Sequence, residues 1–149
     1  MNKARRRLIA GFAAGMLLVV GACSSETSEI TIADSWARAT PPGAESAAFY
    51  GVVTNLSGES DQLVGVSSPQ CEMAQIHETT HSDGVAGMAP AGADLLSLND
   101  GEKLTLEPGG LHVMCMGVSE PLVEGADVQV EFKFEKMGSV EFVLPVQAG

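Results

Sequence analysis

Short runs of alternating apolar and polar residues, separated by turn signals, recur along the chain from residue 30 onward. The clearest are Val128–Phe134 and Val140–Leu144, in which apolar residues occupy every second position. Alternation with a period of two is typical of β-strands that bury one face. We therefore expect strands at Val128–Glu135 and Ser139–Val146, joined as a hairpin that turns at Lys136–Gly138.

The rest of the chain has the same character. Its 17 Gly and 7 Pro, with only 5% aromatic residues, favour many turns over a helical bundle. We find no convincing helical stretch, no internal repeat and no second domain, so we predict one all-β domain, a β-sandwich or small barrel. The further predicted strands are Ile30–Ala39, Ala47–Thr54, Gln62–Val66, Met73–Thr79, Lys103–Leu106 and Leu111–Val118.

The first 22 residues have the pattern of an export signal. Met1–Arg7 contains four of the eight basic residues, and Leu8–Ala22 is an apolar run of fifteen. A membrane-spanning helix needs roughly 20 residues, so this run fits the core of a secretory signal better than a membrane anchor. We predict a cleaved signal over residues 1–22, with a retained helical anchor as the alternative.

The signal ends in Val20-Gly21-Ala22-Cys23, which resembles a bacterial lipobox. The resemblance implies cleavage before Cys23 and a diacylglycerol on its sulfur, so that lipid holds the protein to the bacterial membrane. Residues 23–29 then form a polar tether and residues 30–147 the β domain. The predicted location is extracytoplasmic, facing the periplasm or the cell exterior.

The charge after residue 22 excludes some partners. Four Lys and Arg stand against nineteen Asp and Glu, a net charge of −15. Without a basic patch to meet phosphates, nucleic acid is not an expected partner. The exported part also keeps two cysteines besides Cys23, and an oxidising compartment permits a Cys71–Cys115 disulfide without requiring it.

Soft metal donors crowd into one part of the chain. All three His and four of the five Met that follow the signal lie between residues 73 and 116. Thioether combined with imidazole suits copper, Cu(I) in particular. Zinc would usually recruit thiolate or carboxylate ligands, and calcium or magnesium would require oxygen. The cluster therefore predicts a copper site.

Strand alternation groups some of these donors. In Leu111–Val118 it places His112, Met114 and Met116 on one face and Cys115 on the other. This favours a structural role for Cys115 over a role as a further soft ligand, although the face count alone does not establish its pairing with Cys71.

The remaining donors lie in other segments. His77 falls in the alternating stretch Met73–Thr79. Met88 falls in the Gly-, Ala- and Pro-rich segment Gly84–Gly92, which we interpret as a loop. A methionine in such a loop would be a suitable ligand to cover the metal as a lid. We interpret Met73 and Met116 as core packing first, and keep Met116 and His81 as auxiliary metal ligands.

The order His77, ten residues, Met88, then His112-Val113-Met114 resembles the ligand motif of the PCu(A)C periplasmic copper chaperones. The resemblance covers about residues 30–146. It implies a cupredoxin-like Greek-key fold, and Cu(I) held by His77, Met88, His112 and Met114. It also implies delivery of copper to the centres of a respiratory cytochrome oxidase. Flanking segments that share the likeness are Trp36–Pro41, Leu63–Pro69 and Leu106–Gly110.

Other functions remain open at this point. A copper-buffering or tolerance lipoprotein would use the same site without a dedicated acceptor, whereas a chaperone needs an oxidase subunit or another copper carrier as its partner. An electron-transfer cupredoxin would need a thiolate from Cys115. If the chain is instead a non-catalytic adhesive β-sandwich, the cluster of His and Met residues is accidental. We expect no enzyme, because the sequence shows no nucleophile–base pair or phosphate-binding loop.

Overall fold

The computed structural model describes residues 30–149, so the predicted signal, the lipidation site at Cys23 and the tether lie outside the described residues. All eight predicted strands are present, with small differences at their ends. They are β1 (Ile30–Arg38), β2 (Ser46–Asn55), β3 (Asp61–Ser67), β4 (Cys71–Ser82), β7 (Lys103–Leu106), β8 (Leu111–Val118), β9 (Asp127–Phe134) and β10 (Gly138–Gln147).

Two strands and one short helical turn were not anticipated. Strand β5 (Val85–Pro90) pairs with the end of β4, and the two-residue strand β6 (Ser97–Leu98) pairs with β3. A 3-10 turn at Ala93–Leu96 lies between them. No helix within residues 30–149 has the length and hydrophobicity needed to span a lipid bilayer.

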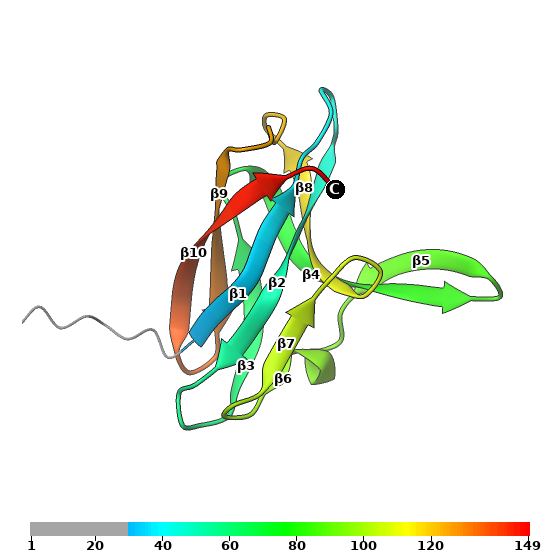
Figure 1. The fold of residues 1–149 in the computed structure, drawn as a ribbon. Coiled ribbons are helices and arrows are strands. Elements are labelled where there is room, and N and C mark those ends of the chain that lie inside the picture. The colour runs from blue at the N-terminus through cyan, green and yellow to red at the C-terminus, as the bar shows by residue number, and fades with distance from the viewer. Residues whose placement is uncertain (1–29) are drawn as a thin grey trace, which may run out of the picture.

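The strands form an open β-sandwich (Figure 1). Their hydrogen-bonded order is β5-β4-β8-β2-β1-β10-β9-β3-β6, with β7 also paired to β2. The sheet folds back on itself, because β3 near one end of this order contacts β4 near the other. The predicted β9–β10 hairpin is present, with Phe134 opposite Gly138 beyond the turn. The all-β prediction is confirmed.

The core lies between the two layers and follows the predicted alternation. On β9, Val128, Val130, Phe132 and Phe134 are each 1% exposed, while the intervening residues face outward or are half-buried. Burying one such side chain contributes roughly 1.5–3 kcal/mol to folding. The same alternation on β8 fixes which of its side chains enter the core.

A disulfide joins Cys71 at the start of β4 to Cys115 on β8, with the two Cα atoms 5.4 Å apart. Cys71, Ala74 and Ile76 all pack on the core. Cys71 lies three residues before Ala74, so the two side chains would point to opposite faces of a regular strand. Counting positions along a regular strand, which gives Cys71 the face of His77, therefore could not identify this bond.

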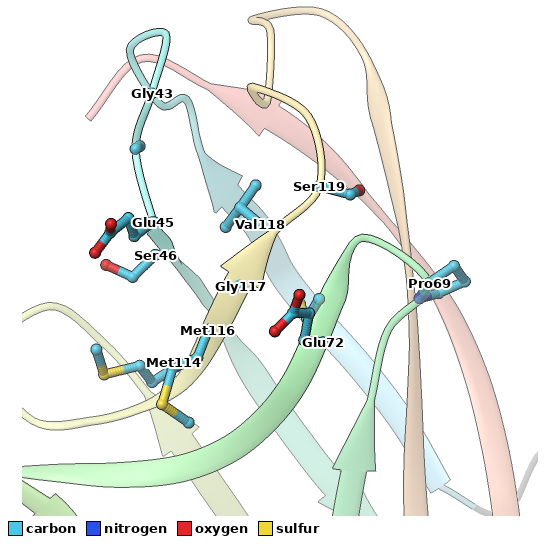
Figure 2. Close-up of a pocket in the computed structure, with 12 residues that line it drawn as sticks. Gly43, Glu45, Ser46, Pro69, Glu72, Met114, Met116, Gly117, Val118 and Ser119 are labelled. Atoms are coloured by element: carbon cyan, nitrogen blue, oxygen red, sulfur yellow. The ribbon is translucent and has the colours of Figure 1, made fainter.

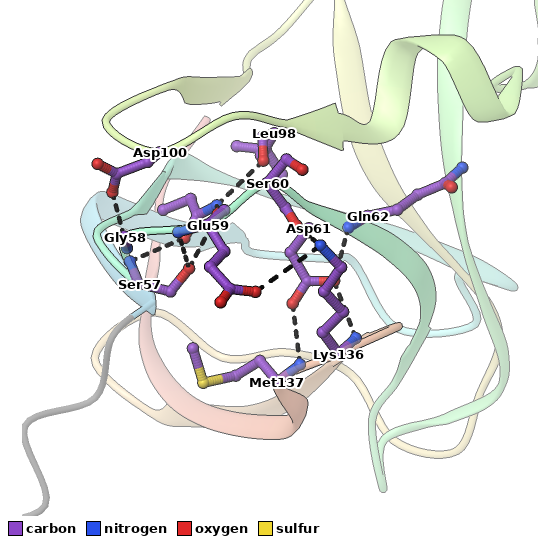
Figure 3. Close-up of polar contacts among 11 residues, drawn as sticks. Ser57, Gly58, Glu59, Ser60, Asp61, Gln62, Leu98, Asp100, Lys136 and Met137 are labelled. Atoms are coloured by element: carbon purple, nitrogen blue, oxygen red, sulfur yellow. Dashed lines mark hydrogen bonds and ion pairs between the residues drawn. The ribbon is translucent and has the colours of Figure 1, made fainter.

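The carboxylate of Asp61 is buried at the end of the sandwich where β3 begins and the β9–β10 hairpin turns (Figure 3). Asp61 accepts hydrogen bonds from the backbone N–H groups of Gln62, Lys136 and Met137, at 2.7, 2.9 and 2.9 Å. These bonds tie the start of β3 to the turn of the β9–β10 hairpin. The side chain of Lys136 also donates to the carbonyl of Ser60.

Candidate metal centre

Three neighbouring strands, β5, β4 and β8, carry the four predicted copper ligands. His77 on β4 is directly opposite His112 on β8, and Met88 on β5 is directly opposite Thr79 on β4. Directly opposite residues share a face of the sheet, as do residues two apart on one strand. His77, Met88, His112 and Met114 therefore share one face, which is the face turned away from Val113 and Cys115.

The rings of the two histidines lie close together. Their ring centroids lie 6.3 Å apart at an interplanar angle of 60°. With a metal–nitrogen bond of roughly 2.0 Å, as in known imidazole sites, one ion can contact both rings at this separation. The pair is thus spaced for a shared ion.

His112 is held in a defined orientation. Its side chain is 6% exposed, and its Nδ1 lies 3.1 Å from the carbonyl oxygen of Gly110. A carbonyl only accepts, so Nδ1 carries the proton and the lone pair of the neutral ring is on Nε2. A backbone carbonyl in this position is a common way to orient a metal-ligating histidine.

His77 has an unsatisfied nitrogen. Its Nε2 lies 3.4 Å from the side-chain oxygen of Gln75, whereas its Nδ1 is buried without a hydrogen-bond partner. Burial lowers the pKa of His77, and the neighbouring imidazole of His112 lowers it further, which favours the neutral ring. A buried, unpaired acceptor costs stability unless something binds it. A metal ion is such a partner.

A hollow of about 320 Å³ adjoins the histidine pair. Met88, His112 and Met114 line it together with Arg38 and Tyr50 from the neighbouring strands. The Tyr50 ring is 6.4 Å from that of His112. Three of the four predicted ligands thus line one cavity, and the His77 ring lies 6.3 Å from that of His112.

The aromatic side of this hollow was not identified from sequence. Trp36 and Tyr50 stack with centroids 4.5 Å apart, and the Arg38 guanidinium lies 5.8 and 5.7 Å from the two rings. The only signal was that Trp36 and Arg38 fall in a segment that shares the family likeness. Their position beside His112 depends on the pairing of β1 with β2 and of β2 with β8, which cannot be predicted from the local sequence.

The interpretation of Gly84–Gly92 as a loop was wrong. Met88 lies on strand β5, which pairs with β4 from His77–Pro90 to Ser82–Val85. Its small residues are tolerated because the β4–β5 ribbon extends from the body, with every β5 side chain exposed (Figure 1). The turn between the strands uses positive φ angles at Asp83 and Gly84. Met88 is 62% exposed, so it remains accessible from outside.

The other predicted donors are placed differently. His81 is exposed on the ribbon, four residues beyond His77 and about 13 Å along the strand. Met73 is 51% exposed, so its interpretation as core packing was wrong. Met116 is half-buried and lines a second hollow beside Met114.

Cys115 is fully buried on the opposite face and is bonded to Cys71, so it provides no thiolate. The electron-transfer cupredoxin interpretation was therefore wrong. Within residues 30–149, no group of three or more His, Cys, Asp or Glu side chains is arranged to hold a metal. A site at the histidine pair would therefore depend on the thioethers.

Comparisons with known proteins agree with this architecture. Residues 30–146 match the family described as "Putative lipoprotein LpqE-like". The relative "Putative lipoprotein Lxx21020" from Leifsonia xyli subsp. xyli is 27% identical over 158 residues, covering 99% of this chain and 93% of the relative.

Among solved structures, the copper-bound PCuAC domain from PmoF2 has a TM-score of 0.65 at 29% identity, covering 81% of this chain and 94% of that one. The Cu(I) form of DR1885 from Deinococcus radiodurans has a TM-score of 0.61 at 29% identity, covering 86% of each chain. These similarities confirm the cupredoxin-like fold.

Proposed function

The chain belongs to the LpqE-like family of lipoproteins, and on that premise we propose that it is an extracytoplasmic Cu(I) carrier. Its solved structural neighbours include a copper-bound PCuAC domain and a Cu(I)-bound protein, which supports copper as the cargo. The ligands in this proposal are His77, Met88, His112 and Met114.

The observation that carries the proposal is the buried, unpartnered Nδ1 of His77 beside the oriented ring of His112. Each imidazole has a nitrogen with no protein hydrogen-bond donor, and thioethers share their face of the sheet. Neutral nitrogen and thioether sulfur suit Cu(I). Thioethers also form no disulfides, which matters in an oxidising compartment.

A carrier must release its ion as well as hold it. Met88 is suited to leave first, because it is 62% exposed on an edge strand, whereas His112 is buried between two neighbouring strands. Loss of one thioether would open a coordination position for a donor from an accepting protein. The proposal assigns no catalytic residue, since transfer by ligand exchange requires none.

We propose more specifically that the protein delivers copper to the assembling centres of a respiratory cytochrome oxidase, through an oxidase subunit or another copper carrier. The alternative is a copper-buffering or tolerance protein that uses the same ligands. A deletion strain separates the two. Defective oxidase assembly at normal copper tolerance supports delivery, whereas copper sensitivity with normal oxidase supports buffering.

We further propose that residues 1–22 are removed as a signal and that acylated Cys23 anchors the protein through the tether 23–29, with residues 30–147 as the copper-binding domain. Metabolic labelling with a fatty-acid analogue tests this. The wild-type chain should be labelled and membrane-bound, and Cys23→Ser should be neither.

An anaerobic titration against a chromogenic Cu(I) chelator tests the central proposal. The full-length chain carries Cys23→Ser, which removes the one thiol outside the disulfide. We expect one tight equivalent, lost in His112→Ala and weakened in the volume-conserving Met114→Leu. His81→Ala is the matched control, because that histidine is exposed on the same strand as His77. A chain that never competes with the chelator would rule out the proposal.

A further inference from the structure

A pair of methionines faces the solvent two positions beyond the proposed ligands. Met73 on β4 is directly opposite Met116 on β8. The next pair along the same two strands is Gln75 and Met114, and the one after it is His77 and His112. All three pairs share one face of the sheet, so soft donors continue past the proposed site in a row.

Packing does not account for this pair. Met73 is 51% exposed and Met116 is half-buried, and neither belongs to the hydrophobic core. Successive pairs along the strands are about 7 Å apart. A methionine side chain has three rotatable bonds, so the Met114 sulfur can turn toward either neighbouring pair.

A hollow of about 840 Å³ opens beside this row (Figure 2). Met114 and Met116 line it from β8, and Glu45 and Glu72 line it from the two segments that flank β8. Its lining contains no Lys or Arg. Two carboxylates without a counter-cation raise the local concentration of positive ions.

The two hollows meet at one ligand. Met114 lines both the larger hollow and the smaller one that contains His112 and Met88. An ion held near Met116 therefore has a path to the histidine pair through a single side chain.

We infer that Met73 and Met116 form a second, weaker Cu(I) site that receives the ion and passes it through Met114 to His77 and His112. This inference rests on the proposed function. The ion stays Cu(I) throughout, because each step forms one bond to copper and breaks another, with no electron or proton transferred. Movement is toward the histidines, since two thioethers bind Cu(I) more weakly than imidazoles and thioethers together.

The test compares the Cys23→Ser full-length chain with the same chain carrying Met73→Leu and Met116→Leu. These substitutions conserve volume and remove only the sulfur donors. Anaerobic titration with Cu(I) against chelators of graded strength should give one tight and one weak equivalent in the parent chain. The double variant should keep the tight equivalent at unchanged affinity, lose the weak one, and load roughly tenfold more slowly in stopped flow.

Two further variants complete the test. Met137→Leu, in the turn before β10, is the matched control and should change neither equivalent. Glu45→Gln with Glu72→Gln should slow loading at low salt by roughly tenfold, and added salt should remove the difference. Equal loading rates at low salt would overturn the role of the carboxylates.

The remaining outcomes separate this inference from the proposed function. A tight equivalent without a weak one in the parent chain overturns the inference and leaves the proposed function standing. Loss of the tight equivalent in the Met73→Leu, Met116→Leu chain overturns the separation into two sites. No Cu(I) binding by the parent chain overturns both.

Discussion

The rings of His77 and His112 lie 6.3 Å apart across the β4–β8 pairing, yet only His112 has a partner for its Nδ1 atom. The carbonyl of Gly110 accepts that hydrogen bond, whereas the corresponding atom of His77 is buried and unpaired. The unpaired nitrogen of His77 thus destabilises the metal-free protein, and a bound metal ion would remove this cost.

The first prediction follows from this asymmetry. His77→Phe removes the unpaired nitrogen while keeping a planar ring, so it should raise the free energy of unfolding of the metal-free protein by about 1 kcal/mol. The same substitution should abolish tight Cu(I) binding. Urea unfolding without metal measures the first effect, and the chelator titration measures the second.

His112→Phe is the matched comparison. It breaks the hydrogen bond to the Gly110 carbonyl, which then keeps only the backbone N–H of Thr79 as its donor, so it should destabilise the metal-free protein by about 1 kcal/mol. Destabilisation of similar size by both substitutions would contradict a special cost at His77.

The second prediction concerns the two methionine ligands. Met88→Ala should weaken Cu(I) binding less than Met114→Ala and should speed release of the ion to a chelator. Met88 is 62% exposed on the edge strand β5, whereas Met114 is half-buried on β8, which has a paired strand on each side. Equilibrium competition and stopped-flow release give the two quantities. An equal or larger loss of affinity in Met88→Ala would contradict the role of Met88 as the exchanging ligand.

The sequence predicted the parts of the site that depend on local alternation. Strand β8 is regular from Leu111 to Cys115, so the shared face of His112 and Met114 follows from counting. The β9–β10 hairpin was predictable for the same reason, because its turn and both of its alternating strands are contiguous.

The parts that depend on long-range pairing were not predictable. Strand β5 has the composition of a loop, and only its hydrogen bonds to β4 make it a strand. Met73 resembles a core residue in sequence, but it pairs with Met116 in the same register as His77 with His112, so it lies on the outer face. The opposition of His77 and His112 required the β4–β8 register, which neither strand specifies alone.

The third prediction is that the Cys71–Cys115 disulfide supplies a large part of the stability. The bond closes a segment of 44 residues. Constraint of the unfolded chain by such a loop contributes about 4 kcal/mol. Cys71→Ala with Cys115→Ala should lower the free energy of unfolding by about this amount, measured by urea unfolding.

The reduced wild-type protein is the control for this pair of substitutions. Its loss of stability should be similar, since both treatments release the same constraint. A double variant as stable as the oxidised protein would contradict the prediction.

The fourth prediction is a dependence of stability on pH at Asp61. Burial raises the pKa of this carboxyl, but the hydrogen bonds from Lys136, Met137 and Gln62 and the charge of Lys136 outweigh burial, so its pKa lies below the ordinary value of 3.8. The stability it contributes is therefore fully present above the pKa of the unfolded chain. It is lost as the pH falls below 3.8 and through the lowered pKa of the folded state.

Asp61→Asn tests this dependence. The amide nitrogen cannot accept the hydrogen bond that Met137 donates, so the substitution should lower the free energy of unfolding by about 2 kcal/mol at neutral pH. It should also make the free energy of unfolding fall less steeply as the pH is lowered. Asp127→Asn, an exposed carboxylate at the start of β9, is the control and should leave both nearly unchanged. Urea unfolding from pH 7 to pH 3 measures the profiles. If the free energy of unfolding falls equally steeply with decreasing pH in the wild-type and Asp61→Asn chains, the buried carboxylate is not the titrating group.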